Sequence, residues 1–303
     1  MLNLFSRPLY IIGNGFDLHH GIPSSYWQFG RYVEANDRST YERVERCFAL
    51  DDSFWNEFEE RLAALDTDTI VDEAENFLVG YGAEDWSDAY HHDYQYEIEQ
   101  AVDAISVTLR ERFAEWIRQL PVPTQLTPGR RLSLDPSARF LNFNYTSTLQ
   151  RLYGIPEGNI LHIHGSASDP TSSLVLGHGW EPDPKPDPYR RYQNPEDADI
   201  RVVQGQELID DYFQRTFKPT ARIIEDRHLY FSQLADVTEI LVMGHSLAEV
   251  DHPYFEEILR YIDVERVHWK VSIFGSDEGS KRLAMENFGI SPSQLEFLPL
   301  SAF

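Results

Sequence analysis

Short apolar runs along the chain have the length of buried strands, and stretches with helical periodicity separate them. Seven such runs are Leu9–Ile12, Arg139–Phe143, Asn159–Ile163, Leu174–Leu176, Glu239–Met243, Trp269–Phe274 and Leu295–Leu298. Strands that alternate with helices form parallel β-α-β units, so we predict an α/β fold with a doubly wound, mainly parallel sheet. Ligands of such sheets bind beyond the carboxyl ends of the strands, where this chain places glycines and polar residues.

Two segments interrupt this alternation within what we expect to be a single domain, residues 1–303. Residues 24–120 follow the first strand and are helical in pattern, so they predict a helical insertion. Its clearest apolar stripe is Tyr94, Ile98, Ala101, Val102, Ile105, Leu109, Phe113, Trp116 and Ile117. Residues 181–199 contain five prolines and predict a surface loop, either a lid near the strand ends or a segment without that role.

The chain is strongly acidic, with 26 Lys and Arg against 50 Asp and Glu and a formal charge of −24. This balance excludes a general nucleic-acid surface, because such binding depends on many cationic contacts to phosphates. It also argues against docking on anionic membranes, and no apolar run is long enough to span one. The segment 51–120 holds nineteen acidic residues and four arginines. That excess predicts solvated helix faces or an acidic surface for a basic partner or a second copy.

The only cysteine, Cys47, has no partner within the chain for a disulfide or a cysteine zinc site. We therefore expect a reducing, cytoplasmic location. The first apolar run ends in a glycine turn and lacks the basic and small-residue flanks of a signal peptide, so we interpret it as a strand.

The first polar strand end is GNGFD, Gly13–Asp17, followed by Gly21, Ile22 and Pro23. Glycines at a strand-to-helix turn permit positive φ and allow a phosphate to approach backbone N–H groups. A tight turn without a ligand would have the same sequence, so both interpretations stay open.

The next strand end is FNYTSTL. Its Asn144 suits a ribose hydroxyl or a water, and either Thr146 or Ser147 suits the N-cap of the following helix.

The third strand end, LHIHGS, places His162 and His164 on the same face of a strand. One of them is a candidate general base, both are candidate structural residues, and a metal pair completed by His178 or His245 is a third interpretation. The pairs His19–His20 and His91–His92 are expected to be solvent-facing or packing residues.

The fourth motif is ILVMGHSLAEVDHPYF, residues 240–255, in which Gly244 and Ser246 offer donors to a phosphate or a ribose. It lacks the second glycine of the hydrolase elbow, so Ser246 is not expected to be a nucleophile.

Taken together, GNGFDLHHGIPSSYWQF, FNYTSTLQRLY, HIHGS and MGHSLAEVDHPYF resemble the AbiH family of bacterial abortive-infection proteins. That family is similar to sirtuin-like proteins, a Rossmann variant that holds NAD. The resemblance implies that Asn144 contacts the ribose and His164 is the catalytic base, and Asp17 is a further catalytic candidate. It also implies a dinucleotide site lined by Gly13, Gly15, Gly21 and Pro23, with Gly244 and Ser246 at the later turn. Neighbouring candidates for the same site are Asn14, Phe16, Thr146 and His245.

Some positions differ from the sirtuin-like pattern. Asn14, Asp17 and Thr146 replace the small residues and the aspartate usual there, and one cysteine cannot supply the four-cysteine zinc module of deacetylases. We therefore expect no structural zinc, and we favour hydrolysis of NAD or a related ADP-ribosyl nucleotide at the N-glycosidic bond.

Two alternatives stay open. One is a non-catalytic nucleotide or ADP-ribose sensor. The other is a metal-dependent nuclease or phosphodiesterase that uses His162 and His164, with Arg190–Arg191 as a local basic cluster. The resemblance also implies a phage-derived trigger as a partner, and homo-oligomerisation stays open.

Overall fold

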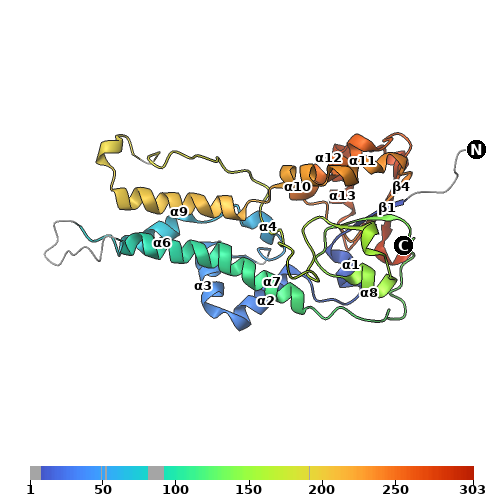
Figure 1. Ribbon diagram of the computed structural model, residues 1–303, viewed down its shortest axis with the longest axis horizontal. Coiled ribbons are helices and arrows are strands. Elements are labelled where there is room, and N and C mark those ends of the chain that lie inside the picture. The colour runs from blue at the N-terminus through green and yellow to red at the C-terminus, as the bar shows by residue number, and fades with distance from the viewer. Residues whose placement is uncertain (1–7, 49, 52, 81–91, 191) are drawn as a thin grey trace, which may run out of the picture. The chain divides into compact units, whose positions relative to one another are not determined.

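The computed structural model describes residues 8–48, 50–51, 53–80, 92–190 and 192–303 (Figure 1). The chain divides into two compact units. The α/β unit comprises the residues up to Ser25, Ile117–Val175 and Pro219–Phe303, and the helical unit comprises Tyr26–Trp116 and Leu176–Lys218. The helical unit thus takes in most of the insertion predicted at 24–120 and adds a second segment, 176–218, from further along the chain.

The α/β unit is built on one sheet of six parallel strands in the order β3-β2-β1-β4-β5-β6. The strands are β1 Pro8–Ile12, β2 Arg139–Asn142, β3 Ile160–His162, β4 Glu239–Met243, β5 His268–Ile273 and β6 Leu295–Pro299. This confirms the predicted α/β class with a doubly wound sheet. The strand order reverses between β1 and β4, which is the switch point where open α/β sheets bind ligands.

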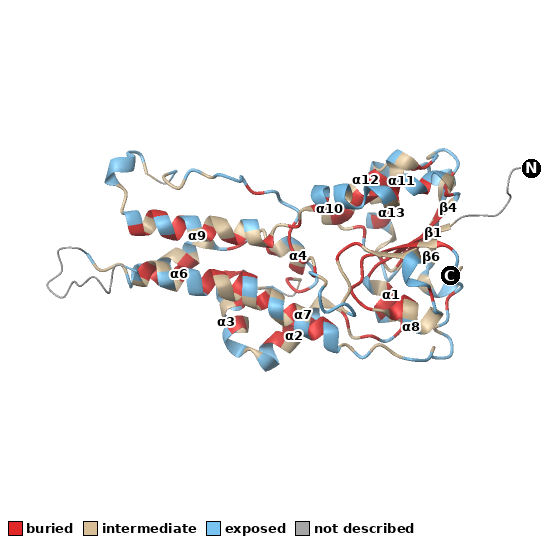
Figure 2. Ribbon diagram, viewed as in Figure 1, coloured by how far each residue is buried: buried red, intermediate tan, exposed pale blue. Residues whose placement is uncertain are grey.

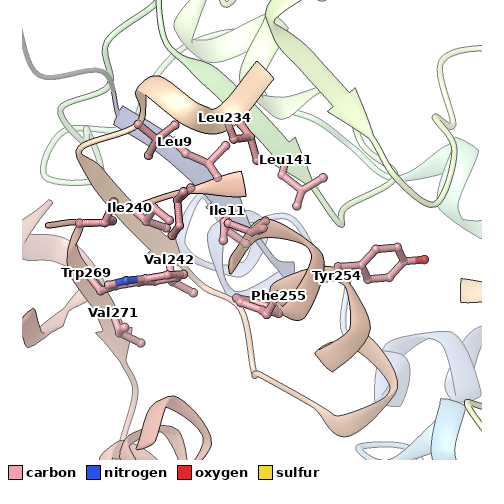
Figure 3. Close-up of a cluster of buried hydrophobic side chains, with 14 of the residues drawn as sticks. Leu9, Ile11, Leu141, Leu234, Ile240, Val242, Tyr254, Phe255, Trp269 and Val271 are labelled. Carbon is pink, nitrogen blue, oxygen red and sulfur yellow. The ribbon is translucent and has the colours of Figure 1, made fainter. Parts of the chain in front are cut away.

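Alternation along each strand explains why both faces of the sheet are covered. Leu9 and Ile11 of β1 belong to one apolar cluster, and Tyr10 and Ile12 belong to another. Figure 3 shows the first cluster, which includes Tyr254 and Phe255 from α12 together with strand residues such as Val242. The helices of this unit are α1 Asn14–His19, α8 Thr148–Tyr153, α10 Thr220–Asp226, α11 His228–Ser232, α12 His252–Tyr261 and α13 Glu278–Asn287.

One predicted strand is wrong. Leu174–Leu176 forms no strand, because its backbone joins no ladder: the Val175 N–H donates to the His164 carbonyl (2.9 Å) and the Val175 carbonyl accepts from the Tyr145 hydroxyl (2.6 Å). Leu174 and Leu176 are buried all the same. Leu174 and Leu176 are therefore apolar because they pack in a buried loop, not because they belong to a strand of the sheet.

The helical unit confirms the predicted helices between the first two strands. Its helices are α2 Tyr26–Asn36, α3 Arg38–Cys47, α4 Phe58–Arg61, α5 Thr67–Glu75, α6 Asp93–Asp103, a π-helical turn Ala104–Thr108, the greater part of α7 Leu109–Gln119, and α9 Ile200–Thr216. The apolar stripe from Tyr94 to Ile117 is buried throughout, and Figure 2 shows buried residues along α6 and α9.

The acidic residues of this region lie at the surface. Every described Asp and Glu between positions 51 and 120 is exposed or half-buried, which favours solvated helix faces as the cause of the local charge. Where it is described, the proline-rich stretch 181–199 contains neither strand nor α-helix, and its one regular element is a short 3-10 helix, Pro195–Asp197. In the part of the chain that the structure describes, no helix combines the length and the apolar character needed to cross a bilayer.

Candidate functional site

The turns that follow β1 and β4 are in direct backbone contact at the switch point. The Gly13 N–H donates to the Met243 carbonyl (3.0 Å) and the Gly15 N–H donates to the Gly244 carbonyl (2.8 Å). Gly244 has a φ of 72°, and a Cβ atom added to it would lie 2.1 Å from the Phe16 nitrogen. A Cβ on Gly13 would lie 2.5 Å from the His245 Cα. Glycine is therefore required here because two main chains meet.

This contact changes the interpretation of the glycine motif. The N–H groups of Gly13 and Gly15 are engaged across the turns, and the Phe16 N–H donates to the Gly13 carbonyl (2.9 Å). All three N–H groups thus donate to carbonyls of the protein itself. The Phe16 ring is buried against His20 and Tyr153. Ligand binding by Gly13, Gly15 and Phe16 stays a prediction, with a structural role now evident for each.

The G-I-P loop is fixed to the start of α1 by Asn14. The Asn14 side-chain nitrogen donates to the Ser24 carbonyl (3.0 Å), and the Ser24 hydroxyl donates to the Asn14 side-chain oxygen (2.5 Å). The Ile22 N–H donates to the Asp17 carbonyl (3.1 Å), and Pro23 is half-buried between these anchors. Asn14 thus positions the loop that contains Gly21 and Pro23 beside the turn after β1.

Asp17 is a buried carboxyl in α1, the short helix that follows the first strand. The Thr146 hydroxyl donates to its Oδ2 (2.6 Å), whereas its Oδ1 has no hydrogen-bond partner among the described residues. Burial raises the pKa of Asp17 from 3.8 to about 6, against the opposing effect of Thr146, Thr148 and Asn144. Thr146 is therefore a partner of Asp17 and not the helix cap; its predicted capping role is wrong, because the N-cap residue of α8 is Ser147.

Asn144 is held on both sides by its neighbours. Its side-chain nitrogen donates to the Gly13 carbonyl (3.0 Å), and its own carbonyl accepts from His162 Nδ1 (3.0 Å). His162 Nε2 accepts from the Gln150 amide (3.0 Å), so the ring is neutral, and burial lowers its pKa. His162 is thus a structural residue that positions Asn144 against the turn after β1.

His164 and His245 share one carboxylate, that of Asp251. His245 Nε2 lies 3.3 Å from Asp251 Oδ2, and His164 Nε2 lies 3.8 Å from Asp251 Oδ1. All three residues are buried, and the Phe143 ring packs against both imidazoles. The Leu247 N–H donates to His245 Nδ1 (2.9 Å), so the proton of the neutral His245 ring is on Nε2, on the side of Asp251.

The turn that contains Ser246 has an unusual backbone conformation. Leu247 has a φ of 62°, which a leucine rarely adopts. Its N–H is bound by His245 Nδ1, and its carbonyl accepts from His252 Nε2 (3.0 Å). Ser246, predicted to contact a ligand, is exposed on this turn. Two histidines of the fourth motif therefore hold a strained turn at the carboxyl end of β4.

Asp251 is the functional candidate that the sequence pattern does not single out. It lies inside the fourth motif, but a short helical turn, Glu249–Asp251, directs it back toward His245. The spacing of six residues does not predict that approach. The sequence feature that could have identified Asp251 is its place shortly after a histidine at the end of a strand in a doubly wound sheet.

The metal interpretation finds no support in the arrangement of side chains. Across the described ranges, no three or more His, Cys, Asp or Glu residues are grouped to hold a metal ion. The Nε2 proton of His245 occupies the position from which that ring would bind a cation beside Asp251. His178 belongs to the helical unit, where it packs among the rings of Trp180, Phe213 and Phe217.

The remaining histidine and arginine predictions concern residues outside the strand ends. His20 is buried and His19 is hydrogen-bonded to the Arg130 carbonyl (3.1 Å), as expected for packing residues, and His92 is exposed. His91 and Arg191 lie outside the described residues, and Arg190 forms an ion pair with Asp210 (2.5 Å).

Comparison with known proteins identifies one family. The family model described as "Bacteriophage abortive infection AbiH" matches residues 9–273, a range that contains every strand-end motif described above. No curated protein and no solved structure matches the chain. Because the matched range covers most of the sequence, the chain belongs to the AbiH family of bacteriophage abortive-infection proteins.

Proposed function

We propose that this abortive-infection protein binds NAD or a related ADP-ribosyl nucleotide at the carboxyl ends of β1 to β4 and hydrolyses its N-glycosidic bond. The observation that carries the proposal is Asp17. It is a buried carboxyl with a raised pKa, placed at the switch point beside Asn144, and one of its oxygens has no hydrogen-bond partner among the described residues. A desolvated carboxylate of this kind suits a reaction that develops positive charge.

The chemistry follows from the groups at the strand ends. As the glycosidic bond breaks, its electron pair moves to the departing nicotinamide nitrogen, and positive charge develops on the ribosyl carbon. The Asp17 carboxylate stabilises that charge, and Asn144 orients the ribose. A water oxygen then bonds to the ribosyl carbon, and His164 accepts the proton that this water releases. Asp251 and His245 act on the orientation of His164, since the carboxylate lies between the two rings.

The test measures nicotinamide release by the purified protein from NAD, with and without phage lysate. Asp17→Asn and His164→Ala are expected to lower the rate about 100-fold or more, because each removes a group that acts in the transition state. Asp263→Asn is the matched control: Asp263 is exposed after α12 and outside the proposed site. No release by the natural sequence under either condition, or an unchanged rate in both site variants, contradicts the proposal.

The same assay separates the alternatives. A nucleotide sensor would bind NAD or ADP-ribose and return it intact, with no nicotinamide released. A metal-dependent phosphodiesterase would lose activity when a chelator is added, whereas the proposed hydrolysis by Asp17 and His164 keeps its rate.

A further inference from the structure

The guanidinium group of Arg130 lies directly on Gly21 of the G-I-P loop. A Cβ atom added to Gly21 would be 2.4 Å from Arg130 Nη1, and the φ of Gly21 is 79°. The positive φ favours glycine at this position, and the short distance to Nη1 shows how closely the end of the arginine side chain approaches the loop. The guanidinium therefore lies within reach of a ligand bound at this loop.

The backbone around Arg130 is fixed from two sides. His19 Nε2 donates to the Arg130 carbonyl (3.1 Å), and the Leu132 N–H donates to the Tyr153 hydroxyl (3.1 Å). That hydroxyl in turn donates to His20 Nε2 (2.8 Å). The pKa values of His19 and His20 are lowered, chiefly by burial and further by the positive charge of Arg130. Arg130 is thus a positioned cation beside two neutral imidazoles.

Arg130 has no anionic partner among the residues that the structure describes, and its guanidinium makes no hydrogen bond to them. It is half-buried, whereas the other described arginines of the α/β unit are either exposed or paired with a carboxylate. This chain has an excess of carboxylates that could pair with a half-buried arginine, and most arginines of the α/β unit that are not exposed are paired in this way. Since no described carboxylate pairs with Arg130, its guanidinium is available to an anion that binds from solution.

We infer that Arg130 binds a phosphate group of an anionic ligand at the Gly21–Ser24 loop. The guanidinium fork matches phosphate geometry, and Asn14 connects this loop to the turn after β1. The inference rests on the proposed function, since an ADP-ribosyl nucleotide carries a pyrophosphate. It also resolves a difficulty in that function: the glycine-turn N–H groups are already engaged, and Arg130 supplies the cationic contact instead.

The experiment compares binding of ADP-ribose, inorganic pyrophosphate and adenosine to the full chain by calorimetry. Arg130→Ala is expected to weaken ADP-ribose and pyrophosphate about tenfold or more, as for loss of a charged hydrogen-bonding group, and to leave any adenosine binding unchanged. Arg130→Lys keeps the charge without the fork and is expected to give an intermediate loss. Arg131→Ala is the matched control, because it removes the same charge from the exposed neighbouring residue. Thermal unfolding of each variant verifies that it is folded.

The outcomes distinguish this inference from the proposed function. If ADP-ribose binds and Arg130→Ala binds it as tightly as Arg131→Ala does, the inference is wrong and the proposed function stands. If pyrophosphate binds through Arg130 but ADP-ribose does not, the phosphate site stands and the proposed function is wrong. If neither ligand binds to the natural sequence, both are overturned.

Discussion

At the scale of single residues, Asp17 connects stability with the proposed chemistry. Its pKa in the folded protein, about 6, lies above the ordinary value of 3.8. The stability that protonated Asp17 contributes is therefore fully present below about pH 3.8 and is lost as the pH rises through about 6. At neutral pH the folded protein contains a desolvated carboxylate whose cost is about 3 kcal/mol.

Asp17→Asn is expected to stabilise the protein at neutral pH by about 3 kcal/mol, because it removes that buried charge while keeping an acceptor for Thr146. The gain should disappear as the pH falls below about 4, where the natural Asp17 is protonated in both states. Denaturant unfolding of both proteins across this pH range is the measurement. A variant less stable than the natural sequence at neutral pH would show that Asp17 has a structural role. A more stable variant that no longer releases nicotinamide would indicate that the charge is retained for function.

At the scale of elements, the turns after β1 and β4 depend on glycine. Gly244→Ala is expected to destabilise the protein by about 3 kcal/mol or more, because the added Cβ meets the Phe16 nitrogen and φ is positive. Gly279→Ala is the matched control: it lies in α13, has open space around it, and should be neutral or stabilising by up to about 1 kcal/mol. Chemical unfolding of the two variants tests this, and equal stabilities would contradict the close contact between the turns.

The strands and helices also show which parts of the fold the hydrophobic pattern of the sequence can predict. Six strands and the α6–α7 stripe were predictable because burial imposes a period on residues that are adjacent in the chain. The strand predicted at Leu174–Leu176 is wrong because a buried loop can be as apolar as a strand. The motifs identified His164 and His245, but Asp251 meets them only through the fold of the turn between β4 and α12. Arg130 was not predicted because it lies far from the G-I-P loop in the sequence and approaches Gly21 only in the folded chain.

At the scale of the whole molecule, no pattern along the chain predicted that residues 176–218 join the helical unit. The connection is made by packing: α9 lies against α6, and the buried Lys218 pairs with Glu59 (3.1 Å). Contacts between segments so far apart in the sequence leave no periodic signal in either segment. The charge excess, by contrast, follows from composition alone, and the described acidic residues of the segment 51–120 are exposed or half-buried, as solvated helix faces require.

That excess predicts how the protein responds to salt. A net charge of −24 means that repulsion among exposed carboxylates outweighs the exposed ion pairs, which are individually weak. Raising NaCl from about 0.01 M to about 0.5 M shortens the range of that repulsion, so the unfolding temperature should rise by roughly 2 °C or more. Glu99→Lys, on the exposed side of α6, should raise it at low salt, and its advantage should shrink as salt is added. A falling unfolding temperature would show that ion pairs and not net charge control the salt response. A Glu99→Lys effect independent of salt would show that this substitution acts through something other than its charge.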